Sequence, residues 1–169
     1  MKPSGFAGPQ KEIVYGTSGW GKSHLLAAFT CFKRRNNVPV VFFPDCKQFI
    51  FSNGLNYLRR ALISAFANDD TILEKINNCT KENDFSELCQ NLPPNTIFIV
   101  DQWNALELEG KDDLEFKKKI HWRNFIDSIS NDHVLVLGAS ANNYTQSLVY
   151  SKQFIMKTFF LVGGFDNVC

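Results

Sequence analysis

The sequence lacks long apolar runs and an excess of either charge. No run approaches the roughly 18 apolar residues that a membrane-spanning helix needs, and the amino-terminal residues contain no apolar core of a signal peptide. A formal net charge of +1 gives no general reason to expect binding to nucleic acid or to an anionic membrane. We therefore expect a soluble protein in which any affinity for polyanions would need a local patch.

The sequence also lacks the cysteine spacings of metal sites and redox pairs. Five cysteines are an odd number, and none forms a C-x-x-C pair or metal-ligand spacing with the three histidines. They are Cys31, Cys46, Cys79, Cys89 and Cys169. This usage predicts a reduced, intracellular setting.

Composition otherwise indicates one ordinary globular domain. The chain has 169 residues, of which 44% are hydrophobic and 21% charged, with neither an internal repeat nor a low-complexity tract. Phenylalanine is frequent, at 16 residues. This number fits a well-filled core, or an apolar surface against which another domain packs.

The most specific feature is the octapeptide from Gly16 to Ser23, which matches G-x-x-x-x-G-K-[ST] at every fixed position. A short apolar stretch of β-prone residues, 12–15, precedes it, and residues 23–36 follow with helical periodicity. Strand, glycine-rich loop and helix is the setting of a phosphate-binding loop. A glycine-rich turn with an incidental lysine is the alternative.

The chemistry of such a loop follows from its residue types. Glycines let backbone N–H groups converge on phosphate oxygens, and the helix N-terminus adds its positive dipole end. We expect Lys22 to reach the β- and γ-phosphates of ATP and to act in catalysis, while the Ser23 hydroxyl binds Mg²⁺. The expected nucleotide-binding residues are Gly16, Thr17, Ser18, Gly19, Trp20, Gly21, Lys22, Ser23 and His24.

A second half of the site is expected after the apolar run 97–100, which ends at Asp101. This has the form of a Walker B strand, whose aspartate would hold Mg²⁺ opposite Ser23. Many ATPases place a water-activating glutamate at the next position, where this chain has Gln102. Gln102 cannot accept the proton, so it either orients water or has a structural role. Glu107 and Glu109 are possible substitutes, although a solvated loop explains both.

Five apolar strands alternate with helical segments, which predicts an α/β fold with a mostly parallel five-stranded sheet between two helical layers. The expected strands are 12–15, 38–43, 96–100, 133–137 and 157–162. Helices are expected over 23–36, 54–68 and 114–129, with one or two short ones in 69–91. Residues 1–10 look like a tail or linker, 11–162 like the NTPase core, and 163–169 like the start of a truncated lid or linker.

A polar segment, 138–143, follows the expected fourth strand. NTPases with an added strand between the two Walker strands present a polar sensor to the γ-phosphate from this position. Ser140 or Asn142 would serve, and Asn142 is our candidate for orienting the nucleophile. A tight turn built from Ser and Asn is an equally good account. The basic runs 33–35 and 117–119 are explained as a helix end and a solvated helix face.

Taken together, these residues resemble the P-loop NTPase module of Crinkler-type proteins, large multidomain effectors related to retrotransposon hot spot proteins. Three stretches in this order carry the specificity of the resemblance: Pro44-Asp45-Cys46, Asp101-Gln102-Trp103-Asn104-Ala105-Leu106 and Ser140-Ala141-Asn142. It implies an ATP-binding module of the additional-strand class, near the STAND and AAA groups, joined to other domains of a longer protein. An effector of this kind would be secreted and would act in a host nucleus.

These observations predict a Mg-ATP-binding module with slow hydrolysis. Two alternatives remain: a non-hydrolysing nucleotide-dependent switch or scaffold, and a truncated relic that exposes apolar surface. Gln102 in place of glutamate and the lack of an identifiable arginine finger favour the switch.

Overall fold

The structure is a computed structural model that describes residues 11–17, 19, 21–106, 113–140 and 157–160. The backbone alone is described for Asp113, Ser140 and residues 157–160. Several expectations fall outside these residues: those on Ser18, Trp20, Glu107, Glu109 and Asn142, and those on the two terminal segments, 1–10 and 163–169.

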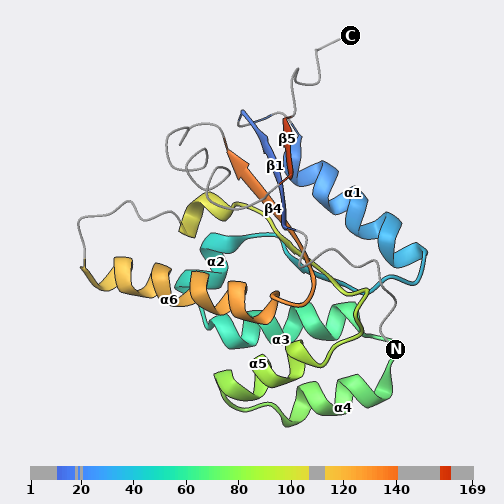
Figure 1. The fold of residues 1–169 in the computed structure, drawn as a ribbon. Coiled ribbons are helices and arrows are strands. Elements are labelled where there is room, and N and C mark those ends of the chain that lie inside the picture. The colour runs from blue at the N-terminus through green and yellow to red at the C-terminus, as the bar shows by residue number, and fades with distance from the viewer. Residues whose placement is uncertain (1–10, 18, 20, 107–112, 141–156, 161–169) are drawn as a thin grey trace.

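A parallel sheet forms the centre of the fold (Figure 1). Its strands lie in the order β2-β3-β4-β1-β5, so that β4 separates β1 from β3. Their bounds are β1 Lys11–Gly16, β2 Val40–Phe43, β3 Ile97–Val100, β4 Val134–Ser140 and β5 Lys157–Phe160. Parallel pairing brings the carboxyl ends of all these strands to one edge of the sheet.

The strand predictions need two corrections. Four strands are described with their side chains, rather than the five we expected, because β5 is described only by its backbone pairing with β1. The fourth strand is also longer than expected. It continues through Gly138, which pairs with Val14, to Ser140, which pairs with Gly16. Residues 138–140 are therefore strand and not turn, because they pair with residues 14–16 at the end of β1.

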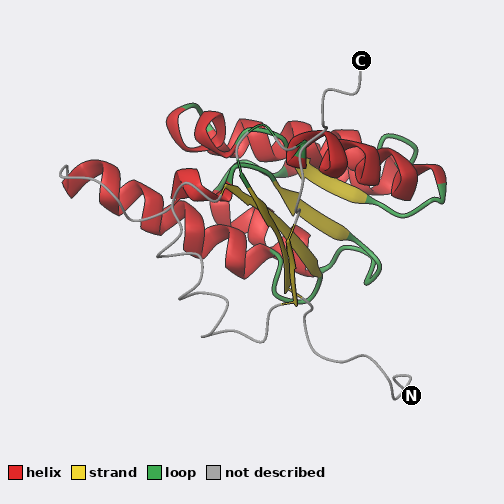
Figure 2. Ribbon diagram, turned by 90° about the horizontal axis from the view of Figure 1, so that it is seen from above, coloured by secondary structure: helices red, strands yellow, loops and turns green. Residues whose placement is uncertain are grey.

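Helices cover both faces of the sheet (Figure 2). One face packs against α1 Lys22–Arg35 through Leu26 and Phe29. The other face carries the larger core, built with α2 Cys46–Phe51, α3 Gly54–Ala65 and α6 Asp113–Ile129. Two short helices, α4 Asp70–Asn78 and α5 Glu82–Gln90, lie beyond α3 and α6 (Figure 1). This is the three-layer α/β arrangement that the alternation of strands and helices predicts.

Local capping explains where the helices of the larger layer begin. Asp45, Asn53 and Asp69 each accept a hydrogen bond from the backbone N–H three residues later, at 2.9, 3.1 and 3.0 Å. One or two short helices are expected in 69–91, and the structure has two there, α4 and α5. The sequence analysis predicts no helix over 46–51, where the structure has α2. The Asp45 side chain in fact starts a helix there.

Aromatic residues fill the core beneath α2 and α3. The ring centroids of Phe49 and Trp122 lie 4.8 Å apart, and those of Phe43 and Phe49 lie 5.4 Å apart, both in edge-to-face geometry. Part of the abundant phenylalanine is therefore core, while Phe32 on α1 is 62% exposed. No helix within the described ranges is long and apolar enough to cross a membrane.

Four described cysteines are free thiols: Cys31, Cys46, Cys79 and Cys89. Of these, only Cys31 is exposed. Burial, followed by the charge of Cys79, raises the pKa of Cys89 to about 12, so this thiol remains protonated at neutral pH.

The contact between Gly54 and Trp122 provides a test of the α3–α6 packing. A Cβ at Gly54 would lie 2.5 Å from the Trp122 ring, so Gly54→Ala should lower the free energy of unfolding by about 1–3 kcal/mol. Chemical denaturation would measure this cost. In a Trp122→Leu background, Gly54→Ala should lower the free energy of unfolding by less than it does in the wild type. If the costs of the two substitutions were simply additive, the packing described here would be contradicted.

Candidate functional site

The candidate site lies where β1 and β3 end. The loop that follows β1 leads into α1, and Asp101 directly follows β3. Since the strands are parallel, both features come to the same edge of the sheet, with β4 between them. The edge where open α/β sheets commonly bind ligands thus carries both halves of the predicted site.

Two glycines shape the loop before α1. Gly19 and Gly21 have φ angles of 85° and 80°, in the left-handed region that L-residues other than glycine rarely adopt. A Cβ at Gly19 would meet no atom within 4 Å, so the backbone conformation, rather than space, favours glycine there. No side chain caps the N-terminus of α1, and its first turn contains no acidic residue. The first N–H groups of α1 therefore remain suited to an anion.

The Lys22 side chain folds back onto this loop. Its side chain is 7% exposed, and its ammonium donates to the carbonyl oxygens of Gly16 and Thr17 at 2.7 and 2.6 Å. Burial lowers the pKa of Lys22, and the negative charge of Asp101 opposes that shift. A phosphate bound here would act in the same direction as Asp101. The Lys22 ammonium thus has two backbone carbonyls of the loop as its acceptors.

Asp101 is held nearly out of contact with solvent. Its side chain is 2% exposed, and its Oδ1 accepts a hydrogen bond from the Gln102 backbone N–H at 2.8 Å. The Asp101 N–H donates to the Phe43 carbonyl at 2.8 Å, which ties the residue to β2. Gln102 has a φ of 58°, an uncommon value for a residue other than glycine. This left-handed backbone conformation is strained for a residue other than glycine. The Gln102 side chain is exposed and therefore free to face a ligand.

Gly138 on β4 is a residue whose role the sequence analysis missed. A Cβ at this position would lie 2.7 Å from the Asp101 Oδ1 and 2.6 Å from the Leu26 Cδ1. Only glycine lets β4 pass between β1 and β3 while the Asp101 carboxylate lies across it. A glycine within an apolar strand signals such a close approach, but the sequence does not tell which neighbour approaches.

A cavity of about 560 Å³ joins these features. Its volume is within the usual range for small-molecule sites. The lining comes from the loop and α1, from Asp101 and the residues after it, from β4 and from α2. The residues are Gly19, Gly21, Lys22, Ser23, His24, Lys47, Asp101, Gln102, Asn104, Ala105, Gly138 and Ala139.

The structure brings most of the predicted residues to this cavity. Ser23 and His24 are exposed in the first turn of α1 and line it beside Gly19 and Gly21. Gly16 and Thr17 contribute their carbonyls to Lys22. The backbone of Ser140 lies at the end of β4, next to Gly16 of β1. Lys47 and Asn104 also line the cavity, although we had not assigned either of them to the site.

The oxygen-bearing residues fit a hard cation such as Mg²⁺. Asp101 and Ser23 line the same cavity, and a carboxylate with a hydroxyl matches the few protein ligands that Mg²⁺ uses beside phosphate oxygens. Across the part of the chain that is described, no group of three or more His, Cys, Asp or Glu side chains could hold a metal ion. A dedicated all-protein metal cage is thus not present among these residues.

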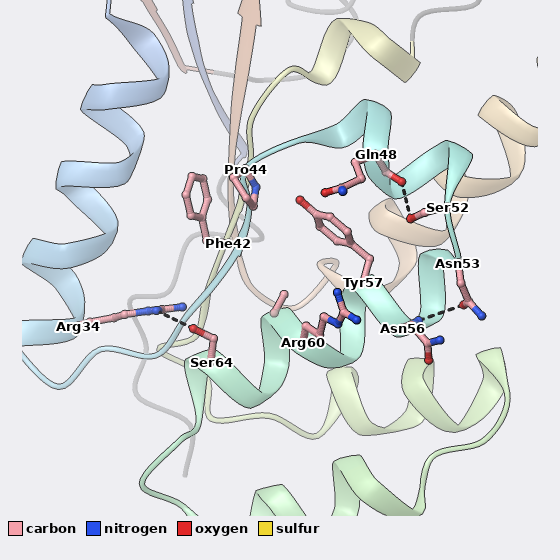
Figure 3. Close-up of a pocket in the computed structure, with 11 residues that line it drawn as sticks. Arg34, Phe42, Pro44, Gln48, Ser52, Asn53, Asn56, Tyr57, Arg60 and Ser64 are labelled. Atoms are coloured by element: carbon pink, nitrogen blue, oxygen red, sulfur yellow. Dashed lines mark hydrogen bonds between the residues drawn. The ribbon is translucent and has the colours of Figure 1, made fainter.

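A second cavity, of about 530 Å³, lies on the other side of α2, beside the outer strand β2 (Figure 3). Its lining contains Arg34, Arg60 and Tyr57, together with Gln48 of α2 and Ser52, which directly follows α2. Some of the hydrogen-bond donors of Arg34 are already used there, because its guanidinium donates to Ser64 Oγ at 3.0 Å and to the Val40 carbonyl at 2.7 Å. Among the described residues, none of those predicted for the nucleotide lines this cavity.

A scan of protein-family models finds no match to this chain, and a search of curated proteins finds no significant match. Among solved structures, the chain is similar to one from an Escherichia coli MS115-1 HORMA:CdnC:Trip13 complex, with 14% identity and a TM-score of 0.48. It is also similar to a DNA replication initiation factor, with 12% identity and a TM-score of 0.43. A third is AMPPCP-bound DnaA from Aquifex aeolicus, with 13% identity and a TM-score of 0.44.

These similarities cover 89%, 89% and 92% of this chain, but 48%, 40% and 42% of the respective partner chains. The chain therefore spans less than half the length of those proteins. At such identities and TM-scores, the likeness assigns neither a family nor a ligand. The resemblance to Crinkler-type proteins finds no support among these comparisons.

The Gly138 contact predicts a specific coupling. Gly138→Ala should lower the free energy of unfolding by about 1–3 kcal/mol, because its Cβ would collide with the Asp101 carboxylate and with Leu26. Denaturation of Gly138→Ala, Asp101→Ala and the double variant would measure the coupling. We expect the double variant to be less destabilised than the sum of the single ones, and simple additivity would show that Gly138 does not position Asp101.

Proposed function

We propose that this chain is a Mg-ATP-binding P-loop module that hydrolyses ATP slowly. The observation that carries the proposal is the convergence of Lys22, the uncapped start of α1 and the buried Asp101 on one cavity. A cation and helix N–H groups suit phosphate, and a carboxylate suits the metal that accompanies it.

Within this proposal, Lys22 exchanges its loop carbonyl acceptors for the β- and γ-phosphate oxygens. This exchange is favourable because a charge-assisted hydrogen bond to an anion is stronger than one to a neutral carbonyl. The residues from Gly16 to His24 surround the phosphates, including Ser18 and Trp20, whose placement is not described. Mg²⁺ would be held by Ser23 and Asp101 and would neutralise phosphate charge.

Hydrolysis requires a water molecule in line with the bond between the γ-phosphorus and the bridging oxygen. The water oxygen forms a bond to phosphorus, the bond to the bridging oxygen breaks, and ADP, phosphate and a proton are released. Gln102 would orient this water through its amide without taking the proton, and the chain contains Asn142 for the same task. A site with no carboxylate at position 102 is expected to turn over slowly.

A nucleotide-dependent switch is the second candidate, and the conformation of Gln102 favours it. Its left-handed backbone directly follows Asp101 and leads into η1, the 3-10 helix Trp103–Leu106, which packs against α2. A ligand that engaged Asp101 would act on this strained segment without any need for turnover. Such a module would serve other domains of a longer, Crinkler-like protein, and a truncated relic of one would bind nothing.

The first prediction for this function concerns binding. Lys22→Ala should weaken the affinity for Mg-ATP by about 10- to 100-fold, because it removes a charged hydrogen-bond donor to phosphate. Isothermal titration of Mg-ATP and Mg-GTP would measure this effect. Lys33→Ala, at the other end of α1, should leave the affinity unchanged. A folded wild-type chain that binds no nucleotide would reject the proposal in favour of the relic.

The second prediction separates enzyme from switch. Steady-state phosphate release by the wild type should exceed that of Lys22→Ala on the same samples, since Lys22 stabilises the charge on the transferred group. Equal rates would rule out hydrolysis by this site. Limited proteolysis would then decide whether bound ATP protects the chain, as the switch requires.

A further inference from the structure

Helix α2 contributes a lysine to the nucleotide cavity that belongs to no phosphate-loop motif. Lys47 is exposed in the first turn of α2 and lines the same cavity as Lys22 and Asp101. Its neighbour Cys46 is fully buried, and Asp45 caps the helix through the Gln48 N–H. The backbone that carries Lys47 is therefore anchored on both sides, while the side chain itself remains available.

Lys47 also has no competing partner. Within the part of the chain that is described, its ammonium takes part in neither an ion pair nor a hydrogen bond. Lys22 differs, because two loop carbonyls already accept from it. Apart from His24, the charged or titratable side chains among the described lining residues are Lys22, Lys47 and Asp101. Among these residues two cations face one carboxylate, and this excess of positive charge is matched to a polyanion.

The sheet order shows from which direction each lysine approaches. Lys47 follows β2, Asp101 follows β3 and Lys22 follows β1, with β4 between the last two. Along the carboxyl edge of the sheet, Asp101 thus lies between the lysines. A phosphate chain that starts at the loop and extends toward Asp101 would bring its far end, the terminal phosphate, to the side of α2.

Packing places α2 close to the predicted metal ligand. Helix α2 contacts η1, which begins two residues after Asp101, and Lys47 and Asp101 line the same cavity. The charges agree with this placement, because burial and then the negative charges of Asp45 and Asp101 raise the pKa of the Cys46 thiol.

We propose that Lys47 binds the terminal phosphate of a nucleoside triphosphate and makes this site distinguish triphosphates from diphosphates. This inference rests on the proposed nucleotide-binding function. A diphosphate held by the loop would lack the group that faces Lys47, so the contact would be lost with hydrolysis. Lys47 is thereby a specificity-determining residue for the nucleotide state.

The same helix offers a matched control. Gln48 lies in the second cavity, as Figure 3 shows, and does not line the nucleotide cavity. Gln48→Ala therefore changes α2 beside Lys47 without removing a group from the nucleotide cavity. Lys75 on α4 is exposed and does not line the nucleotide cavity, so Lys75→Gln removes one positive charge elsewhere on the surface.

The experiment is a titration of Mg-ATP and Mg-ADP into the wild type, Lys47→Gln, Lys47→Arg, Gln48→Ala and Lys75→Gln. Lys47→Gln should weaken ATP binding by about tenfold and leave ADP binding within about twofold, because only ATP presents the terminal phosphate. Lys47→Arg should restore most of the loss, and the two control variants should bind both nucleotides like the wild type. Circular dichroism spectra would confirm that each variant is folded.

The outcomes separate this inference from the proposed function. If ATP binding depends on Lys22 but Lys47→Gln changes nothing, or weakens ATP and ADP equally, the role of Lys47 is overturned and the nucleotide site stands. A loss matched by Lys75→Gln would mean that general surface charge causes the effect, and would also overturn it. If the folded wild type binds neither nucleotide, both proposals fall.

Discussion

The close passage of β4 beneath Asp101 is the constraint on which the rest of the site depends. Because Gly138 has no side chain, β4 fits between β1 and β3 while the Asp101 carboxylate remains buried across it. This places β4 between the loop and the carboxylate, so that one cavity spans the three strand ends. A bulkier residue at Gly138 would have to displace either Asp101 or Leu26, and Leu26 is the anchor of α1 on the opposite face.

The buried charges at this edge are tolerated because each has a partner of suitable chemistry. The Lys22 ammonium donates to two carbonyls, and the Asp101 carboxylate accepts from a backbone N–H. Burial nevertheless lowers the pKa of Lys22, so its charge is less well stabilised than it would be in water. An anionic ligand in the cavity would relieve that penalty. The site therefore holds a buried cation that would gain from phosphate, which is the physical basis of the proposed binding.

Helix α2 contributes to two cavities at this edge of the sheet as well as to the core. It lies between two cavities, presenting Lys47 to one and Gln48 to the other. It also packs on η1, the segment that follows Asp101 and Gln102. A contact between Lys47 and a terminal phosphate would link the nucleotide state to this helix. Such a link would serve a slow ATPase and a nucleotide-dependent switch alike.

The sequence by itself determined the repeating pattern of strands and helices and the phosphate-loop motif, because apolar periodicity and glycine spacing are local properties. It located Gly19, Gly21, Lys22 and Asp101, and the structure brings all four to the candidate site. Only the tertiary structure decided that Lys47 enters the cavity, that Gly138 lies against Asp101 and that β4 continues to Ser140. These are contacts between segments far apart in the chain, and they depend on strand order and register, which the periodicity of a single segment does not encode.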